Sequence, residues 1–325
     1  MFKRLIVAVA GASLALTALS ACGDSGGSGS GSDSGKLVLG FSQVGAESGW
    51  RTANTKDIQE AAKAAGVDLK FSDAQQKQEN QIAAIRSFIK QKVDVIGFSP
   101  VVVTGWDAVL KEAKAAGIPV VLTDRAVDSD PSLYVTFLGS DFVAEGKKAG
   151  DWLVNEYKDA KEPVNIIQLE GTVGAAPAID RKKGFEQAIA ANPNLKVIAS
   201  QSGDFTRAKG KEVMQALLKA HKDVDVLFAH NDDMGLGAMQ AIQEAGLTPG
   251  KDIKIVTVDA VHDGMQALAD GKFNFIVECN PLLGGQLMDT AKKVKAGEKV
   301  PNRIVTVETV FDQAKAKEAL PTRKY

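Results

Sequence analysis

The chain has 325 residues, of which 24% are charged and 45% are hydrophobic, and this length corresponds to about two domains with buried cores. Its 39 Lys and Arg residues nearly balance 40 Asp and Glu residues, and no basic cluster falls on a predicted element, so we expect no nucleic-acid partner. Two cysteines are too few for a disulfide scaffold.

Residues 1–21 have the pattern of a secretory signal peptide, so we do not expect them in the fold. Lys3 and Arg4 give a positive start, and a mostly apolar run follows from residue 5 to residue 18. This run is too short for a comfortable membrane span. The sequence therefore predicts export from the cytoplasm.

The end of this segment, Leu19-Ser20-Ala21-Cys22, resembles a bacterial lipobox and implies lipid on Cys22. Residues 23–35 contain six Gly, five Ser and two Asp, which is typical of a flexible tether. Ordinary signal cleavage beside an incidental cysteine is the alternative, and the tether favours the anchor. We expect residues 22–35 to hold the protein to the membrane by lipid alone, and acylation of Cys22 leaves Cys279 without a disulfide partner.

From residue 36 onward, short β-branched runs alternate with alanine-rich segments of helical periodicity. The first series predicts strands at 37–41, 67–71, 93–98, 118–122 and 133–138, and helices at 52–65, 78–91 and 105–116. Gly66 and Gly117 stand where a helix C-cap is expected, each before the next strand.

A second series repeats the alternation. It predicts strands at 165–169, 196–200, 224–229, 253–258, 273–277 and 303–310, and helices at 142–157, 179–191, 207–220, 235–245, 264–270 and 283–296. Apolar strands that alternate with helices indicate parallel strands covered on both faces. We therefore expect an α/β fold with two doubly wound parallel-sheet lobes and a ligand site at the carboxyl ends of the strands.

Polar and aromatic residues follow many of the predicted strands. Any one of the polar residues could be only a helix N-cap or a solvated loop charge. Because so many stand at the same end of their strands, we expect a shared ligand site. The candidates are Ser42, Trp50, Arg51, Asp73, Asp124, Arg125, Arg181, Phe205, Asn231, Asp259 and Glu278.

The chemistry of these candidates favours a sugar. Planar carboxylate, amide and guanidinium groups form paired hydrogen bonds with adjacent hydroxyls. Trp50 and Phe205 offer flat faces to the C–H surface of a sugar ring, although packing in the core is the alternative for both. If these candidates line one cleft, three arginines face three acidic residues, Asp124, Asp259 and Glu278. This balance suits a neutral polyhydroxy ligand better than a phosphorylated one.

Several motifs resemble the ribose- and galactose-type periplasmic sugar-binding proteins of ABC importers. They are Asp124-Arg125 after a strand, Asp180-Arg181, Asp204-Phe205-Thr206-Arg207 and His230-Asn231-Asp232. Longer runs at 40–51, 75–81, 171–175 and 200–207 are most similar to the galactofuranose-binding proteins of this family. The resemblance covers the chain from about residue 36 to its C-terminus.

The resemblance implies a type I periplasmic binding protein fold, with a three-crossing hinge near residues 139–140, 278–279 and 307–308. One lobe would hold residues 36–139 plus 280–307, and the other residues 140–279 plus 308–325. Trp50 and Phe205 would stack on the sugar ring. The residues expected to bond its hydroxyls are Arg51, Asp124, Arg125, Arg181, Asn231, Asp259 and Glu278. Ribose-type relatives have a hinge glutamine at the position of Glu278, so we do not expect strict ribose specificity.

These features predict an extracytoplasmic, monomeric lipoprotein that binds a small neutral monosaccharide, with galactofuranose favoured. The ligand would close the hinge, and an ABC permease would recognise the closed form. Binding of another pentose or hexose, and a role as a chemoreceptor-linked sensor, remain open.

A sugar-processing enzyme is the alternative from a different class. The chain has neither a nucleophile elbow nor a phosphate-binding loop, and its three histidines lack metal-ligand spacing. We therefore expect no catalysis, no metal and no cofactor. A transcription regulator of this fold would need an N-terminal helix-turn-helix, where this chain has the signal and the tether.

Overall fold

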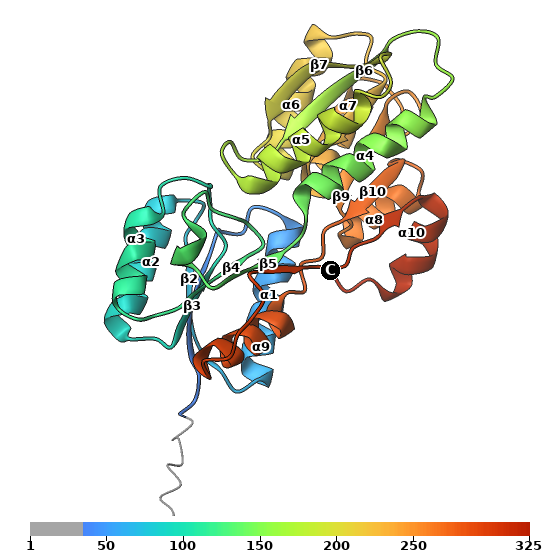
Figure 1. The fold of residues 1–325 in the computed structure, drawn as a ribbon. Coiled ribbons are helices and arrows are strands. Elements are labelled where there is room, and N and C mark those ends of the chain that lie inside the picture. The colour runs from blue at the N-terminus through green and yellow to red at the C-terminus, as the bar shows by residue number, and fades with distance from the viewer. Residues whose placement is uncertain (1–34) are drawn as a thin grey trace, which may run out of the picture. The chain divides into compact units, whose positions relative to one another are not determined.

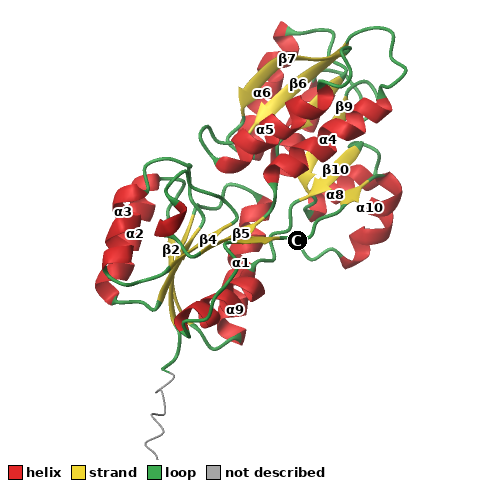
Figure 2. Cartoon of the chain, viewed as in Figure 1, coloured by secondary structure: helices red, strands yellow, loops and turns green. Residues whose placement is uncertain are grey.

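Residues 35–325, which the computed structural model describes, contain two six-stranded sheets. The predicted signal peptide, Cys22 and residues 23–34 of the tether lie outside the described residues. Each sheet is covered by helices on both faces, so the α/β fold with two parallel-sheet lobes is confirmed (Figure 2).

The first lobe is built on a sheet whose neighbouring strands are all parallel, in the order β11-β5-β4-β3-β1-β2. The strands are β1 (Val38–Gln43), β2 (Asp68–Asp73), β3 (Val95–Phe98), β4 (Val120–Thr123), β5 (Thr136–Gly139) and β11 (Arg303–Val305). The helices are α1 (Gly49–Ala64), α2 (Gln78–Gln91), α3 (Asp107–Ala115) and α9 (Gly284–Lys295), with a short 3₁₀ turn at Pro131–Leu133.

Alternate side chains of the first sheet enter two separate cores, because successive residues of a strand point to opposite faces. Leu39 of β1 packs with Ile58 of α1 and Leu287 of α9. On the other face, Ile96 of β3 packs with Phe88 of α2. In Figure 1, α1 and α9 accordingly lie together on one side of this sheet and α2 and α3 on the other.

The second lobe repeats this plan with the strand order β12-β10-β9-β8-β6-β7. Its strands are β6 (Val164–Glu170), β7 (Leu195–Ser202), β8 (Val226–Ala229), β9 (Lys254–Asp259), β10 (Phe275–Glu278) and β12 (Val310–Phe311). Its helices are α4 (Phe142–Glu156), α5 (Ala176–Ile189), α6 (Arg207–Ala220), α7 (Asp232–Glu244), α8 (His262–Ala269) and α10 (Gln313–Ala319), with a 3₁₀ turn at Leu320–Thr322. Residues of α4 and α5 pack in one core, and residues of α6, α7, α8 and α10 pack in the other.

The chain passes between the two sheets three times: after β5, after β10 and after β11. We call these three connections (residues 140–141, 279–283 and 306–309) the hinge. They lie side by side, because the Ser140 hydroxyl is 3.3 Å from the Cys279 sulfur and 3.2 Å from the Thr306 hydroxyl.

Three details differ from the sequence prediction. The single strand predicted at 303–310 is wrong: β11 pairs in the first sheet and β12 in the second, because residues 306–309 form a hinge connection. β12 pairs antiparallel with β10, although only parallel strands were expected. Helix α10 was not predicted at all. Among residues 35–325, no helix has the length and apolar character needed to cross a membrane.

Candidate functional site

One pocket has walls from both lobes. Its lining residues are Glu47, Ser48, Trp50, Arg51, Asp124, Arg125, Pro177, Arg181, Phe205, Asn231, Asp259 and Cys279. Residues 47–51 follow β1 and residues 124–125 follow β4 in the first lobe. In the second lobe the lining comes from α5, from the segments after β7 and β8, from the end of β9 and from the hinge.

The topology explains why residues so far apart in the sequence meet here. In each sheet the strand that comes first in its lobe, β1 or β6, lies between the second and the third. At such a reversal of strand order the connections on either side run to opposite faces, which leaves a crevice at the carboxyl ends of the strands. The two crevices face each other and form the pocket.

Eight of the eleven predicted candidates line this pocket. They are Trp50, Arg51, Asp124, Arg125, Arg181, Phe205, Asn231 and Asp259. Strand-end placement was therefore an informative signal, because parallel strands bring their carboxyl ends to one edge.

The other three candidates lie outside the lining. Ser42 is fully buried in β1. Asp73 is exposed at the end of β2, and its carboxylate accepts a hydrogen bond from the Gln75 amide at 2.7 Å. Glu278 accepts hydrogen bonds from Arg323 at 2.8 Å and from the Tyr325 hydroxyl at 2.9 Å. None of these three side chains lines the pocket.

The candidates omitted four residues of the lining: Glu47, Ser48, Pro177 and Cys279. Glu47 had a usable signal, since it precedes Arg51 by one helical turn in the segment after β1. Ser48 is the N-cap of α1, and its hydroxyl accepts from the Arg51 amide at 3.1 Å. Neither Pro177 nor Cys279 carries a sequence signal for a sugar site.

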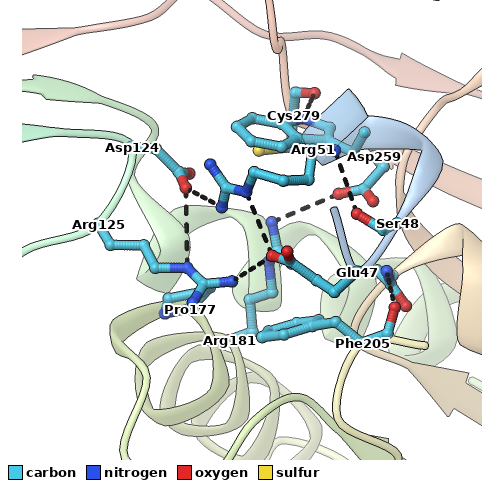
Figure 3. A pocket seen from close by; sticks show the side chains of 12 residues that line it. Glu47, Ser48, Arg51, Asp124, Arg125, Pro177, Arg181, Phe205, Asp259 and Cys279 are labelled. Atoms are coloured by element: carbon cyan, nitrogen blue, oxygen red, sulfur yellow. Dashed lines mark hydrogen bonds and ion pairs between the residues drawn. The ribbon is translucent and has the colours of Figure 1, made fainter. Parts of the chain in front are cut away.

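In the first lobe, two arginines share two carboxylates (Figure 3). Arg51 donates to Glu47 at 3.2 Å and to Asp124 at 2.5 Å. Arg125 donates to the same Glu47 oxygen at 3.1 Å and lies 3.7 Å from Asp124. All four side chains are at most 5% exposed, so their charges interact in a poorly screened environment.

In the second lobe, Arg181 of α5 carries the positive charge. Its guanidinium donates to Glu145 of α4 at 2.7 Å and to the His230 carbonyl at 2.6 Å, and lies 3.7 Å from Asp259. The pocket lining therefore contains three arginines and three carboxylates. The third carboxylate of the lining is that of Glu47, whereas the sequence predicted Glu278.

The two aromatic rings line the pocket and also belong to the hydrophobic cores. The Trp50 indole nitrogen donates to the Cys279 carbonyl at 2.7 Å, which orients its ring beside the hinge. Phe205 packs in the core of the second lobe, and Arg125 lies over its ring at 5.3 Å. A β-carbon at Gly171 would lie 1.8 Å from this ring, so only glycine leaves room for it.

Several site residues have backbone angles that L-amino acids rarely adopt. Asp124 has φ of 59° and Asp259 has φ of 119°. Such conformations cost about 1–3 kcal/mol each and persist only where surrounding contacts hold them. The Asp124 amide donates to the Leu138 carbonyl at 2.7 Å, and this neighbouring strand helps to hold the turn.

Burial and neighbouring charge shift the pKa of several groups in and behind the pocket. Burial and the charge of Arg51 lower the pKa of Arg125 to about 10. Burial works against the charge of Arg181, but Glu145 and Asp259 outweigh it and raise its pKa. The pKa of Asp259 lies well above its usual range, because burial outweighs the attraction of Arg181 and nearby carboxylates add repulsion.

Two buried polar atoms at the pocket lack hydrogen-bond partners. The Nε of Arg125 and one carboxylate oxygen of Glu47 are buried and have no hydrogen-bond partner among the described residues. Buried polar atoms are normally hydrogen-bonded, so such atoms at a pocket indicate a ligand partner.

The two lobes touch around this space. The Gly49 amide of the first lobe donates to Asp233 of the second at 2.7 Å, and the Val103 amide donates to the Gly174 carbonyl at 2.9 Å. These contacts join residues across the cleft, so the conformation described here is a closed one.

Comparison with known proteins places this geometry in a family. Residues 39–299 match the model of the periplasmic binding protein domain. The chain belongs to the periplasmic binding protein family. The galactofuranose-binding protein YtfQ of Escherichia coli (strain K12) is 49% identical over 330 residues, which cover 100% of this chain and 99% of YtfQ.

Two solved structures are similar in both sequence and fold. One, from Mycobacterium smegmatis in complex with β-D-fucofuranose, is 68% identical with a TM-score of 0.88, and covers 89% of this chain and 95% of that one. The other is the binding component of the arabinose ABC transporter of Shewanella sp. ANA-3, bound to α- and β-L-arabinofuranose. It is 52% identical with a TM-score of 0.85, and covers 89% of this chain and 96% of that one. As a member of the periplasmic binding protein family, this chain is extracytoplasmic.

Proposed function

We propose that this protein binds one neutral monosaccharide in its furanose form between the two lobes, and delivers it unchanged to the permease of an ABC importer. The observation that carries this proposal is the pocket itself, in which three arginines, three carboxylates and two aromatic rings from both lobes converge. The pocket supports this function where the fold alone does not, because one fold hosts many functions.

The charges at the pocket support a neutral ligand. Three guanidinium groups and three carboxylates leave no excess of positive charge for a phosphate. The unpartnered Nε of Arg125 is a donor and the unpartnered Glu47 oxygen is an acceptor. A hydroxyl can accept from the first and donate to the second, whereas an apolar or singly charged ligand would leave one of them unpaired.

The relatives support the furanose ring form. YtfQ is named for galactofuranose, and the two structures hold fucofuranose and arabinofuranose. Galactofuranose is the ligand we favour.

Delivery depends on closure of the two lobes about the hinge. We assign residues 36–139 plus 280–307 to the first lobe and residues 140–279 plus 308–325 to the second. A ligand that contacts both lobes binds the closed form better than the open form, so it shifts the population toward closure. The permease then has a closed, loaded surface to recognise.

The attachment of this receptor to the membrane is also part of the proposal. Leu19-Ser20-Ala21-Cys22 and the Gly- and Ser-rich residues 23–35 support a lipid anchor on Cys22. Intact mass of the protein extracted from membranes tests it, because acylation adds the mass of the lipid. Cys22→Ser is the matched control, and an unmodified mass in the parent protein would refute the anchor.

Calorimetry and NMR together test the ligand. D-galactose, D-fucose, L-arabinose and D-ribose are titrated into the protein, and the bound sugar, labelled at its anomeric carbon, is examined by NMR. We expect the furanose anomeric signal to be enriched on the protein relative to free solution. A bound pyranose would overturn the ring assignment, and no binding of any of these sugars would overturn the ligand class.

The same samples separate binding from catalysis. Sugar released after prolonged incubation should be chemically unchanged, as expected for a transport receptor. Accumulation of a new product in proportion to the amount of protein would instead support an enzyme.

A further inference from the structure

A cluster of titratable groups lies at the hinge, behind the sugar pocket. Glu145 of α4, Cys279 and Glu308 place one carboxylate or sulfur atom each within 4.8 Å of one another. Glu145 is 1% exposed and does not line the pocket. Cys279 belongs to both the cluster and the pocket lining, so the two regions adjoin.

Glu308 connects all three hinge connections. Its carboxylate accepts hydrogen bonds from the Ser140 hydroxyl in the first, from the Asn280 amide at 3.1 Å in the second and from the Thr306 hydroxyl at 2.9 Å in its own. Any change of charge on the Glu308 carboxylate therefore affects all three hinge connections.

Glu145 connects the cluster to the pocket. One of its oxygens accepts from Arg181 at 2.7 Å, and Arg181 lines the pocket beside Asp259. Its other oxygen is buried and has no hydrogen-bond partner among the described residues. A buried carboxylate oxygen without a partner next to a second carboxylate is unfavourable, unless one of the two groups carries a proton.

The surrounding charges do not supply the missing partner. The groups that face Glu145 are Arg181 on α5, Asp259 at the end of β9, and Glu308 and Cys279 in the hinge. Glu308 also faces Arg303 of β11, and its backbone carbonyl accepts from the Lys148 ammonium at 3.4 Å. Arg181 is already shared by two carboxylates, those of Glu145 and Asp259.

We propose that Glu145 and Glu308 share one proton at the hinge, and that closure of the lobes around a sugar takes up this proton. With a proton on Glu145, its unpartnered oxygen donates to Glu308 and the repulsion between the two carboxylates disappears. The inference rests on the proposed function only for its second half, the link to sugar binding.

Desolvation determines whether sugar binding takes up or releases the proton of Glu145. Burial, and then the neighbouring Glu308, raise the pKa of Glu145 to about 8 against the opposing charge of Arg181. Opening the cleft exposes Cys279 and admits water to the adjoining cluster, which lowers this pKa. Closure therefore favours the protonated form, and sugar affinity falls as the pH rises through about 8.

Titration calorimetry with D-galactose tests the link, in buffers that differ in ionisation enthalpy. We expect uptake of up to one proton per sugar bound in the wild type. The affinity should fall by up to about tenfold per pH unit between the lower pKa of Glu145 in the open form and its pKa of about 8 in the closed form. Glu145→Gln should bind sugar without this uptake, and Glu170→Gln, a partly exposed carboxylate of β6, should behave as the wild type. Binding without proton uptake in the wild type, or unchanged uptake in Glu145→Gln, would overturn the inference.

Infrared difference spectroscopy gives an answer that needs neither a variant nor sugar binding. Isotope-labelled glutamate shifts the band of a protonated glutamic acid. It leaves in place the bands of Asp259 and of Asp232, whose pKa burial raises to about 7. A glutamic acid in the sugar-free protein whose pKa lies above the usual range of glutamate, and at or below about 8, supports the shared proton, and its absence refutes it. A protein with this band that binds no sugar would refute the proposed function and leave the proton pair intact.

Discussion

Removal of the charge of Asp124 tests the central feature of the site, the arginine–carboxylate cluster in the first lobe. Asp124 accepts from Arg51 at 2.5 Å and from the Ser99 hydroxyl at 3.0 Å, and lies 3.7 Å from Arg125. Asp124→Asn leaves two buried arginines with Glu47 as their only carboxylate. Breaking a buried ion pair from one side costs about 3–5 kcal/mol, which a domain of ordinary stability survives.

The matched control is Glu112→Gln in the same lobe. Glu112 pairs with Arg86 at 2.8 Å, but the two side chains are 42% and 49% exposed, so solvent screens their interaction. Both variants lose one negative charge that pairs with an arginine, but only Asp124 is buried and lines the pocket.

Urea unfolding and sugar calorimetry supply the two readouts. For Asp124→Asn we expect a loss of about 3 kcal/mol in the free energy of unfolding and an affinity reduced at least about 100-fold. Glu112→Gln should match the wild type in both. If the two variants unfold and bind alike, the buried cluster stabilises neither the fold nor the bound sugar.

Three further variants probe the pocket, the core behind it and its boundary. Gly171→Ala puts a β-carbon 1.8 Å from the Phe205 ring and must displace that ring. Calorimetry should therefore show weakened sugar binding, while circular dichroism shows a folded protein. Full affinity would mean that the ring does not contact the sugar. Burial, then the charge of Arg181, hold the pKa of His230 well below 6.5, so only the unfolded chain takes up this proton and stability is lost as the pH falls below 6.5. Thermal unfolding of His230→Gln should show a shallower acid loss than the wild type, and an identical pH profile would count against a buried neutral imidazole. Asp73→Asn should leave affinity unchanged, because Asp73 is exposed outside the lining, and a weakened affinity would return it to the site.

Local pattern was sufficient for most of the fold. Apolar strand runs and helical periodicity predicted all the described helices except α10, and all the strands of both sheets except β11 and β12. Each of these elements buries one face, and the spacing of its own apolar residues shows that face. The prediction failed for residues 303–310, because β-branched residues continue through the segment where the chain leaves one sheet for the other.

Part of the site could also be predicted from the local sequence pattern. Residues at the end of a parallel strand lie at the carboxyl edge of the sheet, so Asp124, Arg125 and Asp259 could be assigned to the pocket without knowledge of their partners. Asn231 also showed that two roles can coincide, since it caps α7 through the Met234 amide and lines the pocket.

What the sequence determined by itself is therefore the alternation of elements, the signal and tether pattern, and the strand-end positions of the polar residues. Tertiary structure decided which charges meet. Glu278 stands at a strand end like the others, but Arg323 and Tyr325, 45 and 47 residues further along, take its carboxylate. Glu47 joins Arg125 across 78 residues. An ion pair depends on the distance between side chains in the folded chain, and separation along the sequence does not encode that distance.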